Sequence, residues 1–407
     1  MNTRTQNNNA LAKVACIVSL AIAVLPAVDY YVPWYLTLFP VIAIFITTLK
    51  RDSDVLPHIR VLSLALLICI LEIWFVYRNN GIFDYFVNFF IASIPCLIAV
   101  QGSRSFADKR FYHTYLKASV LLVAITSLTT IIGLEKYPMA CRELASGSGA
   151  YDKATYLKAN IGGYEFIYAL VLFIPVLCWL ISKSKGFHKI PYIVTLILCA
   201  ICVYKSQFTI AFLCLIISLI VVWFQFHPRW AAVTFVLFVI MLLFGGFTVI
   251  GSFFRWLSEI VNEEYVADRL LQLSQFLSGE AVKTDTSTER LDHYINQISA
   301  FISSPIIGHN MFSYDDSYVS GHSFILDILG GGGIFVAFIF LRACARLREI
   351  VLGVKRKDVN PYVRSTWILL TVISVLNPVV FPVITTIGFM CCLCIQKLGK
   401  PRNITEM

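Results

Sequence analysis

Charged side chains are scarce in this chain of 407 residues: Asp, Glu, Lys and Arg make up only 14% of it, whereas 58% of its residues are hydrophobic. Soluble globular domains carry about 25% charged and about 45–50% apolar residues. A soluble fold could not bury so much apolar surface. The composition therefore argues against the two or three soluble domains that the length would suggest, and it indicates a protein embedded in a membrane.

The sequence also lacks the common motifs of cytoplasmic catalysis. It has no zinc-ligand spacing, phosphate-binding glycine loop or serine nucleophile elbow. Asp52-Ser53-Asp54 resembles the metal-binding pair of nucleotide-sugar transferases, but a three-residue match in a short loop is a weak signal. The net charge of +9 does not indicate nucleic-acid binding, because Lys and Arg fall in short clusters between apolar stretches. We predict no metal, no other cofactor and no nucleic-acid partner.

Paired cysteines are missing from the segments expected outside the membrane. Of the 12 cysteines, all but Cys141 lie within apolar stretches or beside them in loops expected to face the cytoplasm. Cys391, Cys392 and Cys394 share one hydrophobic run without other metal ligands, so we interpret them as packing or lipid-facing residues. Cys141 has no partner outside, and no disulfide is predicted.

Apolar runs long enough to cross a bilayer recur along the chain. The hydrocarbon core is about 30 Å thick and needs roughly 20 residues of helix. Such runs lie at residues 12–28, 32–49, 61–77, 82–100, 114–133, 161–182, 190–204, 209–226, 231–251 and 322–341. The first is expected to stay as an uncleaved span, because the next run is long enough to form a hairpin with it.

The last apolar run, Trp367 to Ile395, is too long for one span and contains Asn377, Pro378 and Pro382. Proline interrupts a helix, so this run predicts two short or kinked helices. The expected fold class is an all-α, polytopic transmembrane bundle of twelve helices, with eleven as the alternative.

Basic residues mark every second loop of this arrangement. They are Lys50, Arg51 and Arg60; Arg104, Lys109 and Arg110; Lys183, Lys185 and Lys189; Arg229; Arg342, Arg346, Arg348, Lys355, Arg356, Lys357 and Arg364; and, past the last helix, Lys397, Lys400 and Arg402. The positive-inside rule therefore places both termini in the cytoplasm. The chain divides into residues 1–251 with nine helices, a large outer loop over 252–321, and residues 322–407 with three helices and a cytoplasmic tail.

The large outer loop is net acidic and carries amphipathic helical patterns. Thr286 and Glu289 have capping-box spacing, and apolar residues follow at helical intervals: Leu291, Tyr294, Ile295, Ile298, Phe301 and Ile302. We expect a helix lying along the membrane face, its apolar stripe on the bundle or the interface, with Arg290, His293 and Gln297 near one flank. Ser304-Pro305 should end it. A weaker helical pattern covers residues 259–277.

Polar residues interrupt the run that follows this loop. His322 is expected at the outer surface and Asp327 about one and a half turns deeper, where a carboxylate is costly and usually faces a cavity. Gly330 to Gly333 loosen the helix or permit close helix packing. Glu72 and Glu165 are the other acids expected within the membrane.

The stretches ERLDHYINQISAFISSPIIGHN and SGHSFILDILGGGGIFVAFIFL, within residues 289–341, resemble the carboxy-terminal signature of the O-antigen polymerase and O-antigen ligase superfamily. That signature has an arginine opening an outer-face helix, a Pro-x-x-Gly exit, and a histidine followed by Ser or Asn at the mouth of a glycine-containing helix. Here these are Arg290, Pro305 with Gly308, and His322 with Ser323. The resemblance covers about fifty residues, and the helix layout extends it in outline only.

The resemblance implies transfer of an undecaprenyl-diphosphate-linked glycan to a second glycan at the periplasmic face of a bacterial inner membrane, without metal or nucleotide. A guanidinium suits the leaving diphosphate, so Arg290 is the candidate stabiliser. A histidine near its ordinary pKa suits removal of the acceptor proton, so His322 is the candidate base, with Asp327 as a candidate to orient it.

One departure from the family pattern concerns a second phosphate-binding arginine. The family usually has Ser-Arg at the outer start of the eighth helix, where this chain has Lys205-Ser206-Gln207. Lys205 could supply the charge, or Arg255 or Arg269 could reach in from the long loop, so this role stays open. Gln207 and His293 are further candidates for substrate binding, and Gly308-His309-Asn310 departs from the usual Gly-x-Gly.

Within the family, His322-Ser323 followed by Phe-Ile-Leu-Asp looks more like the polymerase branch, whose acceptor is another lipid-linked repeat; a ligase would use lipid A core. A transporter of the same lipid-linked sugars is the competing class, but the chain has no matching halves. A structural membrane subunit would leave the Arg290 and His322 pattern unexplained. The expected partners are the lipid-linked oligosaccharide, the bilayer and, as a further candidate, a chain-length regulator.

Overall fold

The computed structural model describes residues 3–32, 109–146, 150–227, 246–261, 263–278, 285–311, 323–352, 358–377 and 382–399, with isolated positions between residues 39 and 71 and between 229 and 234. This part of the chain is helical and contains no strand. Predicted spans at 32–49, 61–77, 82–100 and 231–251 fall mostly outside the described residues. The twelve-helix prediction therefore stays a prediction, whereas the all-α class is confirmed for the described part.

Five described segments are long and apolar enough to cross a membrane: α6 (Lys109–Lys136), α9 (Tyr164–Lys183), Gly186–Lys205, α11 (Thr209–Phe226) and α16 (Phe324–Leu352). The third consists of a short 3-10 turn and α10 (Ile190–Lys205). Several of these helices expose rows of large apolar residues, such as Leu121, Ile125, Leu128 and Ile132 on α6. Such rows are rare on soluble monomers and fit lipid contact.

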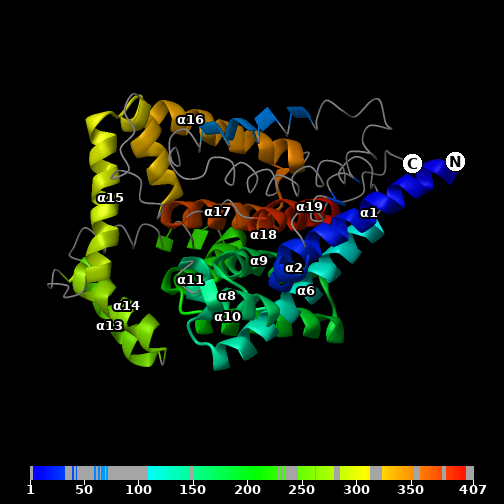
Figure 1. Ribbon diagram of the computed structural model, residues 1–407, viewed down its shortest axis with the longest axis horizontal. Helices are drawn as coiled ribbons and strands as arrows, with labels where there is room; N and C mark the ends of the chain where they lie inside the picture. Colours follow the sequence, from blue (N-terminus) through cyan, green and yellow to red (C-terminus); the bar gives the residue numbers. More distant parts are fainter. Residues whose placement is uncertain are drawn as a thin grey trace.

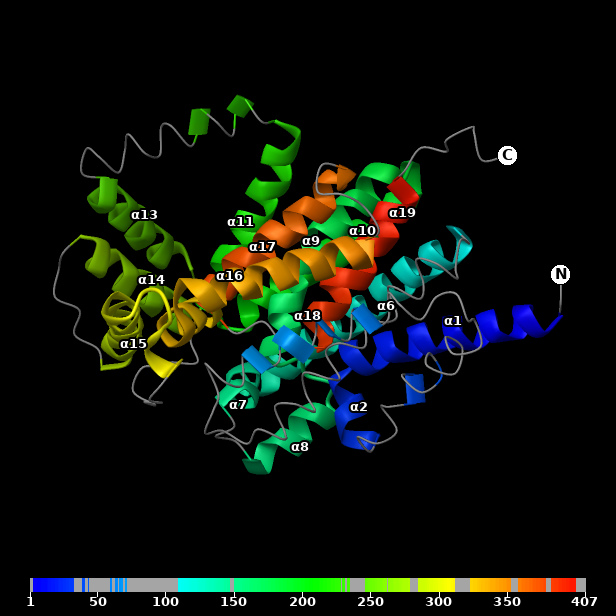
Figure 2. The same cartoon turned by 90° about the horizontal axis from the view of Figure 1, so that it is seen from above.

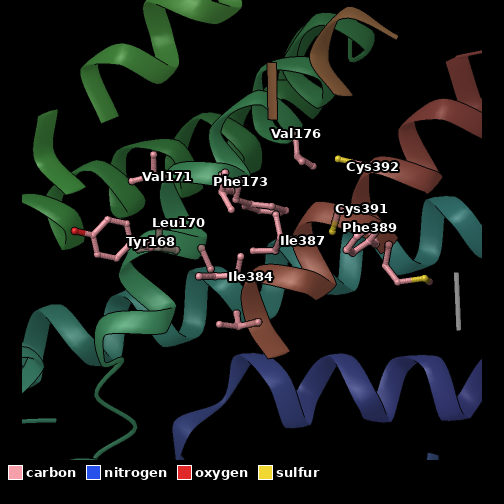
Figure 3. Packing of buried hydrophobic residues seen from close by; sticks show 14 of the residues in the cluster. Tyr168, Leu170, Val171, Phe173, Val176, Ile384, Ile387, Phe389, Cys391 and Cys392 are labelled. Carbon is pink, nitrogen blue, oxygen red and sulfur yellow. The ribbon is translucent and has the colours of Figure 1, made fainter. Parts of the chain in front are cut away.

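The core of the bundle forms around α9. Every residue from Phe166 to Leu177 is buried, so α9 is covered on all sides. It packs against α10, α11, α17 (Pro361–Leu376) and α18 (Pro382–Thr385). Figure 3 shows Tyr168 and Phe173 of α9 in this core together with Ile384, Ile387 and Phe389. A helix that is apolar all round is stable only in such a surrounded position.

The last apolar run is broken as predicted. α17 ends at Leu376, Asn377 caps it, and helix resumes at Pro382 with α18, a π-helical stretch Thr386–Cys391, and α19 (Cys392–Gly399). Cys391, Cys392 and Cys394 are fully buried, so they are packing residues and not lipid-facing ones. Figure 3 shows Cys391 and Cys392 at this core.

The helices before and between the long apolar segments also have defined limits. α1 (Thr3–Val24) and α2 (Pro26–Tyr31) precede the bundle, and α7 (Ala140–Ser146) and α8 (Ala150–Lys158) lie between α6 and α9. α13 (Gly246–Ile260), α14 (Glu264–Leu277) and α15 (Asp285–Ser303) follow α11. α13 crosses the expected boundary between residues 251 and 252. α15 begins before Thr286, which therefore lies in its first turn and not at its cap.

The consecutive helices α9, α10 and α11 alternate in direction, so each end of the bundle gathers a distinct set of residues. At one end the start of α9 meets the end of α17, where Asn377 Nδ2 donates to the Tyr168 hydroxyl over 3.1 Å. At the other, Phe226 of α11 lies against Tyr362 of α17, with ring centroids 4.9 Å apart. The basic residues Lys183 and Arg364 belong to this second end. Which of these two ends faces the cytoplasm stays a prediction.

α16 is sharply bent at Gly333. This residue has φ 65° and ψ −171°, a conformation essentially restricted to glycine. In a straight helix Phe324 and Phe340 would lie about 24 Å apart along the axis, yet their ring centroids are 5.2 Å apart. Figure 1 shows residues 324–332 running beside α15 across the end of the bundle, and the rest of α16 turning along it.

The bend changes the interpretation of the predicted span at 322–341. Asp327 belongs to the segment that crosses the end of the bundle, and the lengthwise segment begins only at residue 334. A bend therefore separates Asp327 from the lengthwise segment, whereas the sequence suggested one continuous helix. The depth of Asp327 in the membrane stays a prediction. Glu165 likewise lies in the first turn of α9, and Glu72 is outside the described residues. The sequence could not reveal the bend because any of four consecutive glycines could have formed it.

Candidate functional site

The two halves of the signature dock on each other through backbone atoms. The bend at Gly333 frees two N–H groups of α16, and these donate to the segment after α15: Ile334 N to the Pro305 carbonyl over 2.9 Å, and Phe335 N to the Ile306 carbonyl over 3.1 Å. A Cβ on Gly333 would lie 2.6 Å from Gly308 N. The Pro-x-x-Gly exit and the glycine run therefore form one interlocked contact that side chains would prevent.

Gln297 and Asp327 join α15 to the first segment of α16. Gln297 Nε2 donates to Asp327 Oδ1, and the two side chains are 1% and 2% exposed. Beside them, a Cβ on Gly330 would lie 3.1 Å from the Gln297 carbonyl oxygen, so the helices are in close backbone approach. A buried carboxylate needs such a donor. Asp327 is thus engaged with α15, a role that the sequence did not assign to it.

Gln297 and His293 mark the side of α15 that faces the protein. Arg290 and His293 precede Gln297 by about two turns and one turn on the same side of the helix. His293 is half-buried, whereas the side chain of Arg290 lies outside what the structure describes. Figures 1 and 2 both place α15 at the end of the bundle, crosswise to α17.

The apolar side of α15 is turned away from the described bundle. Ile295, Ile298 and Ile302 are all exposed. The sequence left two surfaces for the apolar stripe, the bundle and the membrane interface. For these three residues the prediction of packing on the bundle is wrong. The membrane interface remains the predicted one.

Ser323 fixes the start of α16. Its hydroxyl accepts from Leu326 N over 3.2 Å, which makes it an N-cap, and donates to the Val375 carbonyl at the end of α17. The serine of the His-Ser pair thus ties α16 to the same end of the bundle as Asn377. His322, the candidate base, is the preceding residue of the chain and lies outside the described residues.

The turn between α10 and α11 holds the candidates Lys205 and Gln207. Lys205 is the last residue of α10 and is half-exposed. Gln207 is buried with φ 61°, and its carbonyl oxygen accepts from Arg142 Nη1 over 3.4 Å. A guanidinium therefore lies at the turn where the family resemblance leads us to expect a second arginine. Sequence reasoning missed Arg142 because it is distant in the chain, although it is the only arginine in residues 134–160.

Arg142 is carried by a short helix that is tightly fixed. The buried Cys141 thiol donates to the Gly162 carbonyl over 3.0 Å, and burial raises its pKa to about 12. On the other side, the Tyr156 hydroxyl donates to Glu143 Oε2 over 2.5 Å. This hydrogen bond raises the pKa of Tyr156 to about 12, so both groups stay protonated at neutral pH. α7 is thereby held between α8 and the start of α9.

Arg255 and Arg269 lie on the hairpin of α13 and α14. Arg269 Nη1 donates to Gln272 Oε1 over 2.9 Å within α14, and Arg255 is exposed on α13. Arg142, in comparison, donates directly to the Gln207 carbonyl oxygen of the α10–α11 turn. Arg142 is the better supported cation for that turn.

Searches of protein-family models, of curated proteins and of solved structures found no match to this chain. The function is therefore inferred from the signature residues and from the contacts around them. Within the described ranges, no three His, Cys, Asp or Glu side chains are grouped so that they could hold a metal ion.

The described geometry gathers cationic and polar groups at one end of the bundle. Gln207 is followed by Phe208, whose ring lies 6.2 Å from that of Tyr168. Tyr168 accepts from Asn377, and the nearby Val375 carbonyl accepts from Ser323. A continuous series of contacts thus joins Arg142 to the start of α16 and, through Asp327 and Gln297, to α15. Arg142 supplies a cation to this series of contacts.

Proposed function

We propose that this protein is an O-antigen or surface-polysaccharide polymerase. It would transfer an undecaprenyl-diphosphate-linked glycan onto another lipid-linked repeat at the periplasmic face of a bacterial inner membrane. The observation that carries the proposal is the docking of residues 304–308 and Gln297 on residues 327–335. These segments belong to the two halves of the family signature, which sequence alone leaves separate.

The proposed reaction forms a bond between the acceptor oxygen and the anomeric carbon while the bond from that carbon to the diphosphate breaks. Negative charge gathers on the departing diphosphate, and a guanidinium can bind two of its oxygens at once. Arg290 is proposed for this role. The acceptor hydroxyl loses its proton to His322, whose ordinary pKa suits a base at neutral pH.

We assign the second phosphate-binding cation to Arg142. Its contact with the Gln207 carbonyl supports this assignment, as does the anchoring of α7 by Cys141 and Glu143. A cation on a fixed element loses little freedom when it binds the diphosphate. Lys205, on the same turn, is the nearest alternative.

The principal test removes the two proposed catalytic side chains. His322→Ala and Arg290→Ala are each expected to abolish long polysaccharide chains while the protein stays in the membrane at its normal level. His188→Ala, an exposed histidine at the opposite end of the bundle, is the matched control and should leave the chain-length ladder unchanged. Normal ladders from either of the first two variants would refute the catalytic assignment.

A second test concerns Arg142. With purified protein and lipid-linked repeats, Arg142→Ala is expected to lower the polymerisation rate by about 10²-fold, the usual effect of losing one donor to a developing charge. Arg142→Lys should recover only part of the rate, because an ammonium lacks the bidentate geometry. Lys153→Ala on α8, an exposed cation nearby, should have no effect. An unchanged rate in Arg142→Ala would contradict the assignment and leave Lys205 as the candidate for the second phosphate-binding cation.

The glycans that a deletion strain carries identify the acceptor of the reaction. A single repeat attached to lipid A core indicates a polymerase, whereas bare core with accumulating lipid-linked polymer indicates a ligase. Loss of all lipid-linked glycan from the outer leaflet would instead indicate a transporter.

A further inference from the structure

Helix α13 carries an exposed apolar stripe that the proposed reaction does not use. Val249, Phe253, Trp256 and Ile260 are 60%, 51%, 54% and 54% exposed. Their spacing of four, three and four residues places them on one side of the helix. Phe253 and Trp256 lie next to each other, with ring centroids 5.9 Å apart.

The opposite side of α13 is already occupied by protein. Gly251 is buried there, and a Cβ on it would lie 2.5 Å from Ser278 Oγ and 3.0 Å from the Ser274 carbonyl oxygen. α13 therefore packs closely on α14 through this side. A third, polar sector, made of Ser252, Arg255 and Glu259, is exposed beside the stripe. The helix thus has one side packed on protein, one exposed apolar side and one exposed polar side.

The position of the hairpin indicates what covers the stripe. α14 contacts α11, and Figures 1 and 2 both place α13 and α14 beside α15 at one end of the bundle. The hairpin therefore lies at the end of the bundle that α15 crosses and not along the middle of the candidate spans. An aromatic stripe with tryptophan, flanked by charged residues, is typical of helices that lie in this interface.

We propose that α13 is an interfacial helix that docks on the lipid bilayer. Val249, Phe253, Trp256 and Ile260 enter the boundary between headgroups and acyl chains, while Ser252 and Glu259 face water. This surface anchors the α13–α14 hairpin to the membrane independently of any bound glycan.

The test uses spin labels on single introduced cysteines in the full-length protein, reconstituted in nanodiscs of phosphatidylethanolamine and phosphatidylglycerol. Phe253→Cys and Trp256→Cys report on the stripe, and Ser252→Cys and Glu259→Cys are the matched controls on the same helix. Spectra of the parent protein, labelled identically, are subtracted as background. Collisions of each label with oxygen, which concentrates in lipid, and with a water-soluble nickel chelate are measured.

The stripe labels are expected to collide with oxygen and to lose accessibility to the nickel chelate, and the control labels should show the reverse. Equal nickel accessibility at Phe253 and Glu259 would overturn the proposal, because the stripe would be in water. Protection of the stripe labels from both reagents would also overturn it, because another protein or a second copy of this chain would cover the helix.

Discussion

At the scale of single residues, Asp327 shows how a contact redefines a role. Its position in an apolar run suggested a membrane carboxylate that orients a catalytic histidine. The structure instead places it against Gln297, with both side chains buried. Through this contact Asp327 helps to fix the packing of α15 against α16, and with it the position of the start of α15.

Two substitutions separate this positioning role from a role of the negative charge. Asp327→Asn keeps an oxygen acceptor for Gln297, so normal protein levels and long polysaccharide chains are expected. Asp327→Leu leaves the buried amide without its acceptor, which costs about 1–3 kcal/mol; lower thermal stability of the purified protein and shorter chains should result. Loss of polymer in Asp327→Asn with unchanged stability would show that the charge itself is needed.

Gly333 is the residue on which the bend of α16 depends. In Gly333→Ala a Cβ would have to enter a backbone contact, 2.6 Å from Gly308 N, at a φ of 65°. Gly186→Ala is the matched control, because Gly186 also has positive φ, 52°, but nothing lies within 4 Å of its Cβ position. The control should lose about 1–2 kcal/mol from backbone strain alone.

We expect Gly333→Ala to lower the unfolding temperature clearly more than Gly186→Ala, measured on protein purified in the same detergent. Equal shifts of the unfolding temperature in the two variants would mean that the close backbone contact between Gly333 and Gly308 contributes nothing to stability.

At the scale of elements, local signals located many helix limits. α11 coincides with the predicted run at 209–226, α15 ends at Ser303 just before Ser304-Pro305, and α17 ends before Asn377-Pro378. Apolar run length and proline act within a few residues of the chain, so the sequence is sufficient to show their effects.

Other features of the same elements depended on distant segments. Four glycines in a row marked a weak point in α16, but the contact with residues 304–308 selects Gly333 as the bend. The amphipathic pattern of α15 showed two sides. Burial of Gln297 against Asp327 then turned the polar side inward, so that Ile295 and Ile298 face outward. An amphipathic sequence alone does not say which apolar surroundings will receive its apolar side.

At the scale of the whole molecule, the orientation in the bilayer remains a prediction from the basic loops. Ala145→Cys tests it, because Ala145 is exposed near the end of α7. A membrane-impermeant maleimide added to intact spheroplasts is expected to label this cysteine from outside. Labelling that requires opened membranes would reverse the predicted topology.

Cys141, one turn earlier on α7, is the internal control for the same experiment. It is buried, and its pKa is raised to about 12, so almost no reactive thiolate exists between pH 7 and pH 9. Mass spectrometry should find it unlabelled in the folded protein across this range and labelled after denaturation. Modification of Cys141 before denaturation would contradict the packing of α7 on Gly162.

The sequence by itself determined that the chain is helical and apolar, that its basic residues alternate between loops, and where several helices stop. These properties follow from composition and from neighbouring residues. Only the tertiary structure decided that Arg142 meets Gln207, that Asp327 pairs with Gln297, and that α16 bends to cross the end of the bundle. Each of these depends on close contact between segments far apart in the chain, and no local pattern specifies such a contact.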